Sequence, residues 1–247
     1  GNDGHEGNPP SATGSSTNYL WREILARPMF MRILKDFALF EPSKTGKKDQ
    51  GRLVFPRFHQ LRAVERIVAD IEAHGTGRRY LVWHSAGSGK TKTIAWLSHR
   101  LIRHMSADSK STFDSVIVVT DRTVLDENIR HDMNLVQSSQ GLVVTVGEKK
   151  SQAKSPQLKK ALLDGDHIVT CTLQTFPEVM KLIEDTEELR GRRWAVVADE
   201  AHSSQSGSAA RQLKELLVDV ELDEDEDISA DDLLAAKDSA IAASSNI

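Results

Sequence analysis

The chain has 247 residues, of which 28% are charged and 39% hydrophobic, and its formal net charge is −4. This length accommodates one sizeable domain with additional segments, and the composition is that of a soluble protein. No apolar run approaches the length of about 18 residues that a membrane helix needs. The only cysteine, Cys171, excludes a disulfide framework and a cysteine metal site, so we expect a reducing, cytoplasmic location away from membranes.

The charge is unevenly distributed. Residues 219–232 hold nine acidic residues and no Lys or Arg. Without these nine, the chain has 32 basic against 27 acidic residues, so its body is mildly basic. A basic body permits contacts with a phosphate backbone without requiring them. We expect residues 219–247 to form an acidic, disordered insertion.

The N-terminal part is expected to connect domains. Residues 1–17 are rich in Gly, Asn, Pro and Ser, which is typical of a linker or the end of a preceding domain. In the connector, residues 18–51, apolar residues recur at helical spacing and Pro28 separates two short amphipathic helices. We expect their apolar faces to pack against a neighbouring domain. Residues 41–51 are expected to form a polar linker.

From residue 52 to residue 218, predicted helices and strands alternate. Helices are expected at 59–73, 91–104, 124–136 and 208–218. Strands are expected at 79–83, 116–119, 142–146, 167–171 and 194–198. Several strands are continuous runs of β-branched residues, as in strands buried on both faces. The pattern predicts an α/β domain with a parallel sheet and helices on both faces. In such sheets, ligands bind at the carboxyl ends of the strands.

A glycine-rich loop follows the strand expected at 79–83. It consists of His84, Ser85, Ala86, Gly87, Ser88, Gly89, Lys90 and Thr91. The glycines let backbone N–H groups turn toward phosphates, and the following helix offers its positive end. We expect the residues from Ser85 to Thr91 to bind ATP, with Lys90 on the β- and γ-phosphates and Thr91 on Mg²⁺. His84 stands where the strict pattern has Gly. The alternative is a Gly/Ser turn that happens to precede a helix.

An acidic motif, Asp199-Glu200-Ala201-His202, follows the strand expected at 194–198. Asp199 would hold Mg²⁺, Glu200 would take a proton from the attacking water, and His202 would sense the γ-phosphate. With Lys90 they form the candidate catalytic set. The alternative is an acidic helix start that the helix dipole alone favours.

Weaker signals surround these two motifs. Gln60 lies upstream of the loop and could recognise adenine through its amide, although Gln is also common at helix starts. Polar residues at strand ends can hold a nucleic-acid backbone, and their alternative role is helix capping. These candidate DNA-binding residues are Thr120, Arg122, Thr172, Gln174 and Thr175.

In this order, the motifs resemble those of the first motor domain of superfamily 2 helicases. More narrowly, they resemble the restriction (R, HsdR) subunit of type I restriction-modification enzymes. In that family the phosphate loop likewise opens with His and runs into Gly-Ser-Gly-Lys, and the acidic motif is likewise followed by Ser-Gln, here Ser204-Gln205. The resemblance covers roughly residues 1–218.

The resemblance implies a RecA-like P-loop NTPase fold for residues 52–218. It implies ATP-driven translocation of double-stranded DNA coupled to remote cleavage, with methylation (M) and specificity (S) subunits as partners. It also implies a nuclease domain, expected before residue 1, and further motor motifs, expected after Ile247. Two alternatives stay open: a nucleotide- and DNA-binding fragment without turnover of its own, and a superfamily 2 RNA or DNA helicase.

Overall fold

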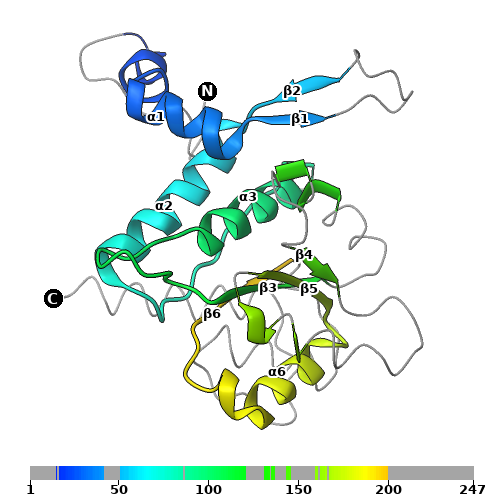
Figure 1. Cartoon of the computed structure of the whole chain (residues 1–247). Helices are drawn as coiled ribbons and strands as arrows, with labels where there is room; N and C mark the ends of the chain where they lie inside the picture. The colour runs from blue at the N-terminus through cyan, green and yellow to red at the C-terminus, as the bar shows by residue number, and fades with distance from the viewer. Residues whose placement is uncertain are drawn as a thin grey trace, which may run out of the picture. The chain divides into compact units, whose positions relative to one another are not determined.

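The chain divides into two compact units, residues 1–62 and residues 63–247. The computed structural model describes Ser15 and residues 17–41, 51–85, 87–120, 131–133, 135–136, 143–145, 159–160, 162–165 and 167–199. Figure 1 shows the described elements as coloured ribbons. The boundary between the two units falls inside helix α2 (Phe58–His74), so the domain limits expected from the sequence stay predictions.

The first unit contains short helical segments followed by a hairpin. The segments are a π-helical turn η1 (Leu20–Ile24), α1 (Arg27–Arg32) and a second π-helical turn η2 (Ile33–Phe37). Pro28 lies in the first turn of α1, where the N–H that proline lacks would have no partner within the helix. The structure therefore confirms two short helical stretches separated near Pro28.

The hairpin was not predicted. Strands β1 (Leu39–Glu41) and β2 (Arg52–Val54) pair antiparallel, and an ion pair joins Glu41 to Arg52. Phe40 and Leu53 lie opposite each other and are both 57% exposed. Strands of three residues are too short for an alternating pattern to be recognised. The polar linker expected at 41–51 therefore included Glu41 of β1, and neither strand was expected.

The second unit is built on a four-stranded sheet of order β4-β5-β3-β6. The strands are β3 (Ser115–Thr120), β4 (Val143–Thr145), β5 (His167–Thr172) and β6 (Trp194–Ala198). All neighbours pair parallel. Every residue of the central strand β3 is buried, as the β-branched run predicted. The predicted parallel α/β sheet is confirmed.

Helices cover both faces of this sheet (Figure 1). Helix α3 (Lys90–Ile102) contacts β3, β5 and β6, and its Trp96 is fully buried. On the other face, Val119 and Cys171 pack with Phe176 of α6 (Phe176–Asp185). A 3₁₀ turn η3 (Glu187–Leu189) adds Leu189 to that core. Cys171 is therefore a buried strand residue, and the two-faced arrangement is as predicted.

One predicted strand is wrong. Residues 79–83 are not in a strand, and Leu81 and Trp83 are 62% and 75% exposed. A strand needs a neighbouring strand that satisfies its backbone groups. Among the described strands, β6 at the end of the sheet pairs with β3 alone, so residues 79–83 do not pair with it. The β propensity of this run shows that its side chains suit a sheet, but tertiary context decides whether a sheet forms.

Several predictions lie outside the described residues. These are the linker at 1–17 apart from Ser15 and Thr17, the helix at 208–218 and the acidic segment 219–247. Part of the helix predicted at 124–136 is described, since residues 131–133, 135 and 136 are helical. Among the helices that the structure describes, none combines the length and apolar character needed to cross a membrane.

Candidate functional site

The glycine loop has the backbone course that its glycines predict. Gly87 and Gly89 have φ values of +73° and +86°, in the left-handed region that favours glycine. The Ser88 N–H donates a hydrogen bond to the Ser85 carbonyl at 3.3 Å. A Cβ placed on Gly87 would meet no atom within 4 Å, so the dihedral angle, not space, requires glycine there. Ala86 lies outside the described residues.

Helix α3 begins directly after this loop. Gly89 is its N-cap, Lys90 is its first residue, and no side chain caps the N-terminus. The first backbone N–H groups of an α-helix have no acceptor within the helix, and the helix dipole is positive at this end. An uncapped N-terminus behind a glycine turn is a fitting site for an anionic group, and Lys90 and Thr91 both lie in this first turn.

Two polar contacts fix residues 131–133 against α3. Lys92 Nζ lies 2.6 Å from an Asp132 carboxylate oxygen, and both side chains are largely buried. His99 Nε2 lies 3.0 Å from the Met133 carbonyl oxygen. Because a carbonyl only accepts, the Nε2–H group of His99 is the donor. Neither contact was predicted, because no local pattern links residues this far apart in the chain.

Burial controls the titration of His99. The side chain is 3% exposed, and burial lowers its pKa from 6.5 to about 4 despite the hydrogen bond to Met133. Its Nδ1 atom has no hydrogen-bond partner in the part of the chain that the structure describes. His99 is therefore a neutral core residue of α3.

Asp199 follows β6 and extends its pairing. Its N–H donates to the Val119 carbonyl at 2.9 Å. Trp194, Val196 and Ala198 pack against the core on the α6 side of the sheet. Because side chains alternate along a strand, Asp199 falls on the opposite side, which α3 covers. Glu200 and His202, the other two residues of the predicted acidic motif, lie outside the described residues.

Polar residues also gather at the carboxyl ends of β3 and β5. Thr120 pairs in register with Thr172, and the Leu173 N–H donates to the Thr120 carbonyl at 2.8 Å. The hydroxyls of Thr172 and Thr175 share a hydrogen bond at 2.9 Å. Thr175 is the N-cap of α6, but its side chain makes no capping hydrogen bond. The structure thus brings Thr120, Thr172, Thr175 and Asp199 to one edge of the sheet.

Of the other predicted DNA contacts and the predicted adenine contact, the structure describes Gln174 and Gln60. Gln174 is exposed, and Arg122 lies outside the described residues. Gln60 is buried in the first turn of α2, where its Oε1 accepts a hydrogen bond from the Arg57 N–H at 2.9 Å. This bond satisfies a backbone donor at the helix start, which is the role expected of a Gln that begins a helix.

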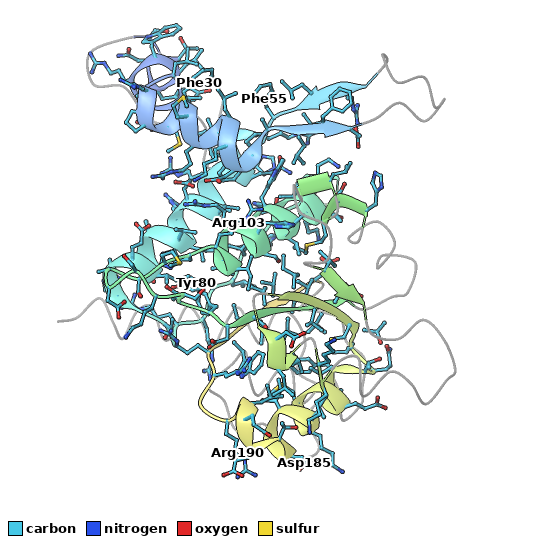
Figure 2. All side chains as sticks on the ribbon, in the orientation of Figure 1. Phe30, Phe55, Tyr80, Arg103, Asp185 and Arg190 are labelled. Carbon is cyan, nitrogen blue, oxygen red and sulfur yellow. The ribbon has the colours of Figure 1, made fainter. Side chains whose placement is uncertain are left out.

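A further cluster holds the segment between α2 and the glycine loop. The Tyr80 hydroxyl donates to Asp70 of α2 at 2.8 Å, and Arg78 and His74 contact the same carboxylate at 3.1 and 2.8 Å. Tyr80 is labelled in Figure 2. The hydrogen bond from Tyr80 lowers the pKa of Asp70, while partial burial and that bond raise the pKa of Tyr80 to about 12. The cluster was not predicted, because its members are separated by a turn.

Comparison with known families decides the assignment. A family model described as SWI2/SNF2 ATPase matches residues 59–222, which include the glycine loop and the acidic motif. The chain belongs to the SWI2/SNF2 ATPase family. As a SWI2/SNF2 ATPase, it carries a helicase-like motor domain that uses a nucleoside triphosphate.

Curated relatives of this SWI2/SNF2 ATPase are named as type I restriction enzyme endonuclease subunits. One from Methanocaldococcus jannaschii is 24% identical over 80% of the chain. One from Staphylococcus aureus strain COL is 27% identical over 66% of the chain. The chain spans only 20% and 16% of their lengths. A Mycoplasma pneumoniae relative, named as a C-terminal part, is 25% identical over 64% of the chain and 77% of its own length. These matches confirm the resemblance inferred from the sequence.

Among solved structures, the chain is similar to the UvsW helicase from bacteriophage T4. The TM-score is 0.47 with 16% sequence identity, and the match covers 78% of this chain and 56% of the helicase.

The described residues fit a magnesium nucleotide. The uncapped N-terminus of α3 and the two left-handed glycines suit a phosphate chain. The hydroxyl of Thr91 and the carboxylate of Asp199 are oxygen donors of the kind that Mg²⁺ prefers. The donor set thus agrees with the nucleotide use of the family.

Proposed function

We propose that this chain is the ATP-binding part of the motor in a type I restriction endonuclease subunit. In this proposal, ATP hydrolysis drives translocation along double-stranded DNA and leads to cleavage far from the recognition site. The names of the relatives support the enzyme class. The observation that carries the proposal is the glycine loop at the start of α3, where no side chain caps the helix. Helix α3 packs against the sheet, and Asp199 directly follows strand β6 of that sheet.

Each motif residue has a distinct role in the proposal. Lys90 and the loop backbone from Ser85 to Gly89 bind the phosphates. Thr91 and Asp199 hold Mg²⁺, which neutralises charge on the phosphate oxygens when it is bound. Glu200 accepts the proton of the attacking water, and His202 responds to the γ-phosphate.

The nucleic-acid side of the proposal uses the carboxyl ends of β3 and β5. We assign backbone contacts with DNA to Arg122, Thr172, Gln174 and Thr175, because polar side chains there can bind phosphate oxygens. Thr120, predicted with this group, is fully buried and is therefore not assigned a contact with DNA. M and S subunits are the proposed partners, the cytoplasm is the proposed location, and Gln60 is the proposed adenine contact.

Nucleotide binding by a Lys90→Ala variant tests the proposal. Loss of a charged hydrogen-bonding group costs about 1.5–3 kcal/mol, which corresponds to roughly 10- to 150-fold weaker binding of ATP with Mg²⁺. Lys181→Ala is the matched control, because Lys181 is an exposed lysine of α6 on the other face of the sheet. Equal ATP affinities of the Lys90→Ala variant and the parent would refute the site.

A further inference from the structure

Thr120 occupies an unusual position at the end of the central strand. Thr120 is fully buried, with 0% of its surface exposed. Its hydroxyl oxygen has no hydrogen-bond partner among the described residues. Buried hydroxyls are nearly always hydrogen-bonded, so an unpaired one at the edge of a candidate site requires an explanation. Full burial also argues against a direct contact between this side chain and a DNA backbone.

Thr120 lies between Thr172 and Asp199 at the carboxyl end of the sheet. On one side lies Thr172, whose hydroxyl is already bonded to Thr175 at 2.9 Å. On the other side lies Asp199, whose N–H bonds to the carbonyl of Val119 at 2.9 Å. By strand alternation, Thr120 and Asp199 point to the same side of the sheet. Adjacent strands are about 4.8 Å apart, so a threonine hydroxyl can reach the neighbouring carboxylate.

We propose that Thr120 is a positioning residue for Asp199. Its hydroxyl donates a hydrogen bond to the Asp199 carboxylate and orients that carboxylate for the Mg²⁺ of the bound nucleotide. The inference rests on the proposed function of this site. Carboxylates that ligate metals are normally hydrogen-bonded by a second group, and losing that group typically weakens metal affinity by about 10- to 100-fold.

The test compares three variants of the intact protein. Thr120→Val keeps the shape and removes the hydroxyl, and Thr120→Ser keeps the hydroxyl. Ser115→Ala is the matched control, since Ser115 begins the same strand, is also 0% exposed and also has a hydroxyl without a partner among the described residues. The quantity measured is the Mg²⁺ concentration that gives half-maximal binding of a fluorescent ATP analogue.

We expect Thr120→Val to raise this Mg²⁺ concentration at least about 10-fold. Thr120→Ser and Ser115→Ala should leave it close to the parent value, and binding of the analogue in EDTA should be the same in all variants. In an Asp199→Asn background, Thr120→Val should have no further effect, because the two residues act as one unit. Should Thr120→Val not fold, Thr120→Cys replaces it, since a thiol is a weak donor.

Two outcomes would overturn the inference. One is an unchanged Mg²⁺ requirement in Thr120→Val, and the other is weaker DNA binding by Thr120→Val with a normal Mg²⁺ requirement. In either case, if Lys90→Ala and Asp199→Asn still impair nucleotide binding, the proposed function stands and only the role of Thr120 fails. If those two variants bind nucleotide normally, the proposed function itself fails.

Discussion

Acidification should destabilise the chain through one buried histidine. His99 has a pKa of about 4 in the folded state, against 6.5 for an ordinary histidine. Because the folded pKa is depressed, the unfolded chain binds more protons between these two values, and stability falls as the pH falls through this window. The full difference corresponds to about 3 kcal/mol. Between pH 7.5 and pH 5, about 2 kcal/mol of it should be lost.

Urea unfolding at both pH values measures the effect. The comparison variant is His99→Gln, whose amide can still donate to the Met133 carbonyl but does not titrate. Carboxylates contribute to the pH dependence of both proteins, so the informative quantity is the difference between them. The parent should lose about 2 kcal/mol more than the variant. His131→Gln, at an exposed histidine, should behave like the parent. Equal losses in parent and His99→Gln would refute the assignment of a neutral, buried His99.

Two further predictions concern α3 and the acidic motif. Lys92→Ala leaves the largely buried Asp132 carboxylate unpaired, so we expect a loss of about 2 kcal/mol in the free energy of unfolding. A Lys92→Met/Asp132→Leu double variant should recover most of this loss, and a double variant no more stable than Lys92→Ala would contradict the pairing. In the intact protein, Glu200→Gln should bind ATP normally and lose hydrolysis by at least about 100-fold, as expected for a general base. Steady-state hydrolysis and fluorescent nucleotide binding check this, and an active variant would move the base to another residue.

The sheet could be predicted because its strands are locally distinctive. Val116 to Val119 and Trp194 to Ala198 are continuous apolar runs, Ile168 to Cys171 is apolar except for Thr170, and each lies in a strand of the structure. Strands buried on both faces need no alternation, and their spacing along the chain leaves room for crossover segments. The parallel arrangement follows from that spacing.

The errors arose where distant residues decide the structure. Tyr80 to Trp83 has the composition of a strand, but Tyr80 is hydrogen-bonded to Asp70 and the run has no strand neighbour among the described residues. The pairing of Leu39 with Val54 joins residues that are well separated in the chain, and neither three-residue strand carries a pattern of its own. Propensity describes which surface a side chain suits, and tertiary contacts decide whether that surface is present.

The residue types of the candidate site could be predicted from the sequence, but the contacts that surround them could not. The glycine loop and Asp199 carry local patterns whose chemistry is specific. The burial of Thr120 and the Lys92–Asp132 ion pair carry none, because burial and ion pairing arise only when separate segments fold together.

The Lys92–Asp132 pair also constrains how this sequence can change over generations. Replacing either residue alone leaves a mostly buried charge beside a neutral or like-charged neighbour, and such intermediates lose stability. Natural variation at the two positions should therefore be correlated: charge-swapped or doubly apolar pairs are acceptable, and mixed pairs are rare. Lys92 lies only two residues after Lys90 of the phosphate loop. The residue at position 132, although distant in the sequence, therefore restricts which residues can stand at position 92 as the sequence diverges.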